Sequence, residues 1–132
     1  MKERIHVVAG ALFDGLGRVL IAQRPPGSHM AGKWEFPGGK LEDGEERLQG
    51  LRRELSEELG VEVGVAEPLI RYEHEYPARR VILDMWRVLD YRGEPTSLEG
   101  QALRWVLLED LGSTDLLEAD APIVNALLNL PA

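Results

Sequence analysis

The chain has 132 residues, of which 44% are hydrophobic, and this size predicts one domain with its own core. Its formal net charge of −8 argues against non-specific binding of DNA or RNA polymers and against attraction to an anionic membrane surface. There is no cysteine, which excludes disulfides, thiolate catalysis and cysteine-based zinc sites. The sequence has no apolar run of about 18 residues that would span a membrane, and it starts without a signal-peptide core, so we expect a cytoplasmic protein.

The first third of the chain is predicted to consist of strands and a loop. Residues 4–13 and 18–23 are apolar and rich in β-branched side chains, and the DGLG sequence between them is typical of a turn, so we expect a β-hairpin. Residues 24–40 are rich in proline and glycine and predict a loop with at most a short strand at 34–36. A loop of this length in a small domain usually has a function.

The next element is predicted to be an amphipathic helix over residues 45–60. Asp43 or Gly44 is the expected N-cap, and Gly60 is the expected glycine at the C-terminal end. Leucines recur at intervals of three, four and four residues and should form the buried face: Leu48, Leu51, Leu55 and Leu59.

Three glutamates crowd one side of this predicted helix. Glu54 is followed at i+3 and i+4 by Glu57 and Glu58, so all three side chains lie about one turn apart, at the edge of the leucine face. Three like charges so close together require compensation. A hard divalent cation such as Mg²⁺, which prefers oxygen ligands, would provide it.

The second half of the chain predicts several further strands and one more helix. The strand-like runs are residues 61–65, 69–76, 81–89 and 102–108, with a turn at 77–80. Asp120 is the expected N-cap of a last helix that has Pro122 in its first turn. This order of elements predicts a mixed α/β fold, most simply a sheet between helices.

The glycine turn and the acidic helix follow one extended motif. From Gly39 to Val61 the sequence fits G-x5-E-x7-R-E-U-x-E-E-x-G-U, where U is aliphatic, at every specified position. On this motif the chain resembles the Nudix hydrolase family. The resemblance implies a Nudix-type α/β/α sandwich, with a mixed sheet between helices, built by one domain of residues 1–132. It also implies an enzyme that hydrolyses a nucleoside diphosphate linked to another group.

The resemblance assigns roles to the residues of this motif. It implies that Glu54, Glu57 and Glu58 bind Mg²⁺ or Mn²⁺, with the carbonyl of Gly38 as a further ligand. Bound metal polarises phosphoryl oxygens and activates water. The glutamate that acts as the general base varies within the family, and for this chain we favour Glu54 over Glu57. Arg53 lies one turn before Glu57 and can pair with it, which would steady the crowded cluster.

Stretches outside the motif resemble the MutT branch of the family, whose members hydrolyse oxidised purine nucleotides such as 8-oxo-dGTP. These stretches are residues 20–40, 74–77 and 99–105. They imply cleavage of a (d)NTP to the (d)NMP and pyrophosphate, a reaction that protects DNA by sanitising its precursors. A CTP or 5-substituted dCTP pyrophosphatase is the alternative substrate class. A Nudix-fold module that binds nucleotide without hydrolysis is the alternative of another class. A monomer and a homodimer both remain open.

Candidate substrate contacts lie on both sides of the glycine turn. Arg24 matches a position that contacts the nucleotide in the MutT branch, and Lys40, directly after the glycines, is well placed for a phosphate. Trp34 and Phe36 border the same turn, so we expect one of them to line the base pocket. Glu99 matches a loop carboxylate that contributes to the metal site or to base catalysis.

Asp120 departs from the pattern of the best-known MutT enzymes, which carry an asparagine that reads the purine edge. An ionised carboxylate only accepts hydrogen bonds. It could accept them from a purine N–H and exocyclic amine or from the N4 amine of cytosine, so Asp120 leaves the preferred base open. Capping of the last helix would explain this aspartate equally well.

Overall fold

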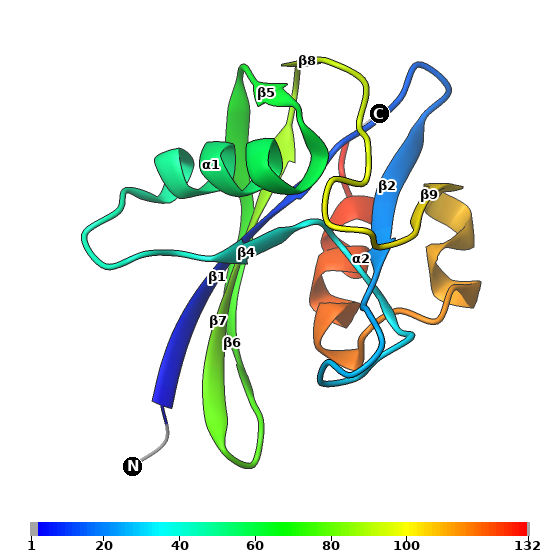
Figure 1. Cartoon of the computed structure of the whole chain (residues 1–132). Helices are drawn as coiled ribbons and strands as arrows, with labels where there is room; N and C mark the ends of the chain where they lie inside the picture. Colours follow the sequence, from blue (N-terminus) through cyan, green and yellow to red (C-terminus); the bar gives the residue numbers. More distant parts are fainter. Residues whose placement is uncertain (1–2, 132) are drawn as a thin grey trace.

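The centre of the fold is a four-stranded mixed sheet with the strand order β4-β1-β7-β6 (Figure 1). The computed structural model describes residues 3–131. Strand β1 (Glu3–Ala11) runs parallel to β7 (Arg79–Val88) and antiparallel to β4 (Gly38–Lys40). Strand β6 (Ala66–Glu75) forms an antiparallel hairpin with β7. The glycine turn of the motif is therefore part of the sheet edge.

Two smaller sheets complete the strand structure. A three-stranded sheet has the order β3-β2-β9 and contains β2 (Arg18–Gln23), β3 (Trp34–Glu35) and β9 (Leu103–Leu107). A two-stranded sheet joins β5 (Glu62–Val63) to β8 (Tyr91–Arg92). The helical elements are α1 (Arg47–Leu59), the 3₁₀ turns η1 (Leu108–Ser113) and η2 (Glu118–Asp120), and α2 (Ala121–Leu128).

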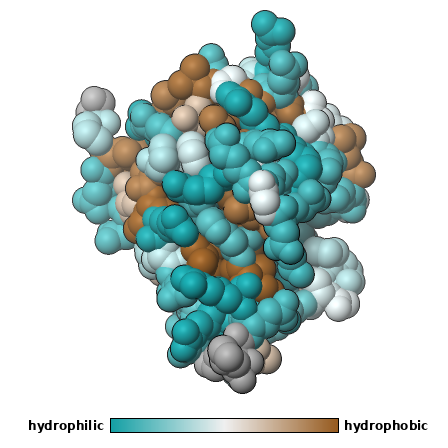
Figure 2. Space-filling view, turned by 90° about the vertical axis from the view of Figure 1, so that its left-hand side faces the viewer, coloured by the Kyte–Doolittle hydropathy of each residue, from teal (hydrophilic) through white to brown (hydrophobic). Residues whose placement is uncertain are grey.

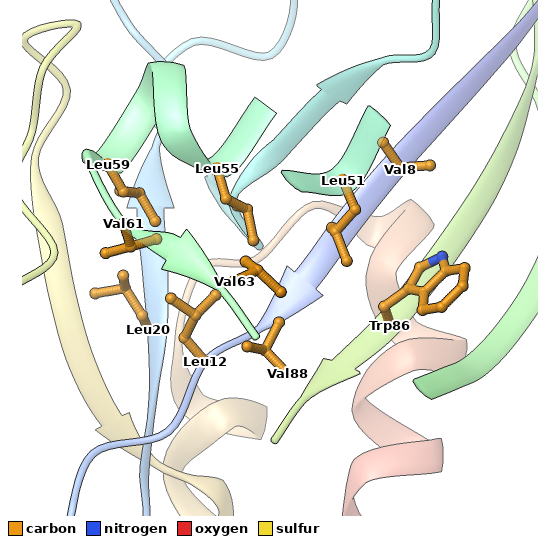
Figure 3. Close-up of a cluster of buried hydrophobic side chains, with 10 residues drawn as sticks. All are labelled: Val8, Leu12, Leu20, Leu51, Leu55, Leu59, Val61, Val63, Trp86 and Val88. Atoms are coloured by element: carbon orange, nitrogen blue, oxygen red, sulfur yellow. The ribbon is translucent and has the colours of Figure 1, made fainter. Parts of the chain in front are cut away.

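The two helices pack on opposite faces of the large sheet, because successive side chains of a strand point to opposite faces. On one face, Val8, Trp86 and Val88 pack against Leu51, Leu55 and Leu59 of α1, as Figure 3 shows. On the other face, Ala9 and Met85 pack with Ile123 and Leu127 of α2. The predicted α/β/α sandwich and the predicted leucine face are both confirmed.

The face of the molecule in Figure 2 is largely hydrophilic, with hydrophobic residues in separate patches. Within residues 3–131, no helix is long and apolar enough to cross a membrane.

The predicted hairpin of residues 4–13 with residues 18–23 is confirmed next to its turn, where Phe13 pairs antiparallel with Val19, but it does not extend along β1. Strands β1 and β2 belong to different sheets and meet only beyond the end of β1, where Phe13 bridges Val19 and the Leu20 N–H donates to the Leu12 carbonyl at 3.0 Å. Strand β1 instead pairs along its whole length with β7, which lies far away in the sequence. Local turn chemistry could not reveal that competing partner.

The predicted N-cap of α1 is also wrong, whereas its end at Gly60 is confirmed. The helix begins at Arg47, and Glu46 occupies the N-cap position without a side-chain capping bond to any residue between 3 and 131. Residues 42–45 form a turn instead, in which the Glu42 N–H donates to the Glu45 carboxylate at 3.0 Å. Gly60 has a φ of 70°, the left-handed conformation that glycine adopts without strain.

A buried carboxylate ties the first residue of α1 to the large sheet. Asp84 of β7 is 1% exposed and accepts hydrogen bonds from Arg47 at 2.6 and 2.7 Å and from His6 at 2.8 Å. The Arg47 guanidinium also lies over the Trp86 ring at 5.1 Å. Burial opposes ionisation of Asp84, but these bonds outweigh it and hold its pKa below the usual value. A cation at a helix N-terminus is itself unfavourable, so the pair with Asp84 must offset that cost.

Asp84→Ala should therefore lower the free energy of unfolding by about 2 to 3 kcal/mol, because it leaves the half-buried Arg47 and His6 without their acceptor. Urea denaturation at pH 7 measures the change. The double variant Arg47→Met/Asp84→Leu replaces the ion pair by apolar side chains and should recover most of the loss. A change below about 0.5 kcal/mol in Asp84→Ala would contradict an anchoring role.

Candidate active site

The glycine turn lies directly against the helix that carries the glutamates, with β4 passing beneath α1 (Figure 1). A Cβ atom on Gly39 would lie 2.2 Å from Oε2 of Glu54, and one on Gly38 would lie 2.0 Å from the Val8 carbonyl oxygen. A side chain at Gly38 would clash with backbone atoms, so this glycine is required by close approach, as the motif implied. A side chain at Gly39 would displace the Glu54 carboxylate.

The glutamates of α1 differ in their surroundings. Glu58 is 7% exposed, and both of its oxygens are held: Oε2 accepts from the Gly38 N–H at 3.1 Å and Oε1 from Nε2 of Gln101 at 2.9 Å. Glu54 is half-buried, whereas Glu57 is exposed. The three side chains lie on the predicted edge of the helix, and one of them reaches down to the glycine turn.

Arg53 is the principal cation of the cluster. Its guanidinium donates to Glu54 at 2.9 Å and to Glu57 at 3.4 Å, which confirms the predicted pair with Glu57. Its shortest bonds go to Glu45, at 2.7 and 2.9 Å, and it also donates to the Lys40 carbonyl at 3.0 Å. These bonds lower the pKa of Glu45 to about 2. Arg53 thus joins the turn before the helix, the helix itself and β4.

The electrostatics bring Glu99 into the same cluster. Burial raises the pKa of Glu58 to about 7, and the charges of Glu35 and Glu99 contribute to that rise. Burial also raises the pKa of Glu54, with further contributions from Glu57 and Glu99. The helix and the loop after β8 therefore present several carboxylates close together, with a net excess of negative charge.

This oxygen-rich, negatively charged set fits a hard divalent cation in its donor chemistry. Within residues 3–131, no three acidic or histidine side chains are already arranged to hold a metal ion. Glu54 and Glu58 accept hydrogen bonds from Arg53, Gly38 and Gln101. Each carboxylate oxygen has two lone pairs, so these bonds leave acceptor capacity for a metal ion.

A cavity of ≈ 250 Å³ opens beside the glycine turn. Its walls come from β1, β7, the segment from Glu35 to Lys40, and the segment before α2. Four of the predicted substrate residues line it: Arg24, Phe36, Lys40 and Asp120. The cavity and the carboxylate cluster share Gly38 and Gly39, so a ligand in the cavity would extend toward the glutamates.

Trp34 is not among the residues that line the cavity in the described part of the chain, so its contact with the substrate stays a prediction. It is half-buried and packs against the core cluster that contains Ile123 and Leu127. Its backbone is bound on both sides by the segment before α2, through the Asp115 carbonyl at 2.8 Å and the Leu117 N–H at 2.9 Å. Phe36, two residues later, lines the cavity.

Arg24 is fixed in the cavity wall by Glu35, a residue that the sequence analysis did not single out. The guanidinium donates to Glu35 at 3.0 and 3.2 Å and to the His29 carbonyl at 2.5 Å. Burial raises the pKa of Glu35, although its ion pair with Arg24 opposes that effect. Tyr76 and Arg79, at the tip of the β6–β7 hairpin, also line the cavity. The only sequence signal for them was the HEYP stretch that ends at Pro77.

Asp120 lies at the N-cap position of α2, but its side chain makes no capping bond in the described part of the chain. The capping explanation of this aspartate is therefore wrong. The carboxylate is 4% exposed, lines the cavity and accepts a hydrogen bond from the Phe36 backbone. Burial, together with the charge of Glu35, raises its pKa to about 7.

Known proteins resemble this chain in sequence over nearly its whole length. A family model described as a NUDIX domain matches residues 8–126. The CTP pyrophosphohydrolase of Escherichia coli K12 is 42% identical over 130 residues, which cover 98% of this chain and 96% of that protein. The 8-oxo-dGTP diphosphatase of the same organism is 34% identical over 128 residues, which cover 97% and 99%.

Solved structures agree with these sequence relationships. The solution structure of the E. coli ORF135 protein has a TM-score of 0.85 at 40% identity and covers 96% of this chain and 90% of that one. A structure from an analysis of MutT from Aliivibrio salmonicida and Vibrio cholerae has a TM-score of 0.83 at 35% identity, with coverage of 97% and 100%. The protein thus belongs to the Nudix hydrolases. Enzymes of this family generally depend on a divalent metal ion.

Asp120→Asn should flatten the dependence of stability on pH. The pKa of Asp120 is about 7 in the folded state and about 4 when unfolded, so the folded state binds this proton more tightly. The contribution of the protonated Asp120 carboxyl to stability is full below pH 4 and is lost as the pH rises through 7. Between pH 5 and pH 8.5 the wild type should lose about 2 to 4 kcal/mol more than the variant, measured by urea denaturation. Equal pH slopes in the two proteins would contradict the buried carboxyl.

Proposed function

We propose that the protein hydrolyses a nucleoside triphosphate to the monophosphate and pyrophosphate, with Mg²⁺ or Mn²⁺ as cofactor. The observation that carries this proposal is the shared wall of Gly38 and Gly39, which joins the cavity of ≈ 250 Å³ to the carboxylate cluster. In this proposal Glu54, Glu57, Glu58 and Glu99 hold the metal. The carbonyl of Gly38 supplies a further oxygen. We also propose a cytoplasmic location. The oligomeric state, a monomer or a homodimer, stays a prediction.

The chain's own residues suit the roles that hydrolysis requires. We propose that water attacks the β-phosphorus, as the MutT resemblance implies, so that the nucleoside monophosphate is the leaving group. A bound metal would polarise the phosphoryl oxygens and neutralise the charge that develops on this leaving group. Glu54 is the favoured base, because Oε1 is occupied by Arg53 whereas Oε2 faces Gly39 at the cavity wall. That oxygen would take the proton of the attacking water. Glu57, which is exposed, is the alternative base, and Lys40 would bind a phosphate oxygen from the cavity rim.

The nucleobase of the substrate would lie in the part of the cavity that is farthest from the carboxylate cluster. Apolar side chains of the sheet, with Phe36, provide surfaces for a flat ring. Asp120 is placed to accept hydrogen bonds from an exocyclic amine. We propose an oxidised guanine nucleotide such as 8-oxo-dGTP as the principal substrate, in line with the relatives of that name.

A cytosine nucleotide is the second candidate substrate, and a specific observation favours it. A carboxylate is the side chain that pairs with the N4 amine of cytosine. The E. coli relative named CTP pyrophosphohydrolase is also 42% identical to this chain. Asp120 could therefore accept hydrogen bonds from either nucleobase, the oxidised guanine or the cytosine.

Values of kcat/KM for 8-oxo-dGTP, dGTP, dCTP and CTP decide between these candidates. We expect 8-oxo-dGTP to exceed dGTP by about tenfold or more, a difference of roughly 1.4 kcal/mol in transition-state binding. A higher value for CTP or dCTP would establish the cytosine alternative. Tight binding of all four nucleotides without release of pyrophosphate would make the protein a nucleotide-binding module instead.

Glu57→Gln should lower kcat by roughly 10³-fold, or about 4 kcal/mol, without unfolding the protein, because it removes a charged ligand from an exposed position. Steady-state kinetics and a thermal melt measure the two effects. Glu46→Gln is the matched control, since Glu46 is an exposed glutamate at the start of the same helix. Near-normal turnover in Glu57→Gln would refute the assigned metal cluster.

A further inference from the structure

The loop between β8 and β9, which carries Glu99, is docked on the C-terminal end of α1. The Thr96 N–H donates to the Leu59 carbonyl at 3.0 Å, and the Leu98 N–H donates to the Glu58 carbonyl at 3.1 Å. The last carbonyls of a helix lack partners within the helix, so these bonds satisfy two of them. The backbone of the loop is thereby fixed to the helix that presents the glutamates.

The side chain of Gln101 continues this attachment to the carboxylate itself. Its Nε2 donates to Oε1 of Glu58 at 2.9 Å, while the Ser97 hydroxyl lies 3.0 Å from its Oε1 and 2.5 Å from its backbone oxygen. The amide therefore presents its nitrogen to Glu58 and its oxygen to the Ser97 hydroxyl, so that both ends of the amide have a hydrogen-bond partner. Since Gly38 holds the other oxygen of Glu58, that side chain is clamped between the glycine turn and Gln101.

A neutral donor suits this position for an electrostatic reason. Glu58 follows Glu54 and Glu57 on the same side of α1, and the loop that carries Glu99 is hydrogen-bonded to the end of that helix, so the position of Gln101 lies among like charges. A lysine or arginine in place of Gln101 would offset these charges, but it would also neutralise Glu58 and compete with a cation. The amide orients the carboxylate and leaves its negative charge available.

We propose that Gln101 is a positioning residue of the metal site. Its amide sets the orientation of Glu58 and keeps the Glu99 loop against α1, so that carboxylates from the helix and the loop are close before a metal ion binds. This inference rests on the metal site of the proposed function. Among the described residues, Gln101 is not one that lines the cavity. Its substitution should therefore weaken metal binding and slow turnover without changing nucleotide binding.

Gln101→Met tests the inference, because methionine has a similar length and no hydrogen-bond donor. Binding of Mn²⁺ to the nucleotide-free chain, followed by electron paramagnetic resonance, should weaken by about 10- to 100-fold. The kcat should fall by a similar factor, with KM for the nucleotide changed less than about twofold. Gln49→Met, at an exposed position of α1, is the matched control and should bind Mn²⁺ like the wild type.

Ser97→Ala provides a second and milder variant, since it keeps the amide and removes only the hydroxyl that restrains it. It should weaken Mn²⁺ binding less than Gln101→Met does. Thermal melts without metal show whether either variant is folded at the temperature of the binding assay. Wild-type Mn²⁺ affinity in both variants would overturn the inference.

The Mn²⁺ measurement separates this inference from the proposed activity. If the wild type hydrolyses none of the nucleotides, yet Gln101→Met alone weakens Mn²⁺ binding, the activity fails and the positioning role stands. If the wild type binds no Mn²⁺, the metal site and the role of Gln101 fail together.

Discussion

Repulsion among carboxylates at the edge of α1 is the constraint on which the rest of this structure depends. Glu54, Glu57 and Glu58 follow one another within little more than a turn of helix, and Glu99 approaches from a loop. Arg53 offsets part of this charge, but its shortest bonds go to a glutamate outside the helix. The cluster therefore keeps a negative excess, which is what a divalent cation requires and what the surrounding fold must withstand.

The fold resists that repulsion by holding α1 from several directions at once. The leucine face packs on the sheet, and Asp84 binds Arg47 at the first residue of the helix. At the other end, the backbone of Thr96 and Leu98 caps the last carbonyls. Because these anchors come from different elements, the glutamates are presented on a rigid support, as precise binding of a small ion demands.

The two faces of the large sheet divide the work of the enzyme. One face supports α1 and its charges, while the other supports α2 and the cavity that Asp120 lines. The faces meet only at the sheet edge, where Gly38 and Gly39 border both. In the proposed function, the bond to be cleaved and the nucleobase to be selected would thus be governed by separate parts of the molecule. This separation is consistent with the names of two relatives from the same family, of which one is named for CTP and the other for 8-oxo-dGTP.

The resemblance of one extended motif predicted the family of this protein, and spacing within single elements predicted the geometry of its acidic helix. The leucine face, the end of α1 at Gly60 and the crowding of the glutamates all follow from helical periodicity, which depends only on neighbouring residues. Partners distant in the chain were decided by the tertiary structure. In the tertiary structure β1 pairs with β7 and not with β2, Trp34 packs half-buried against the core, and Asp120 lies beside the Phe36 backbone. These contacts depend on which distant strands pair with one another, and the local pattern of a sequence does not specify that pairing.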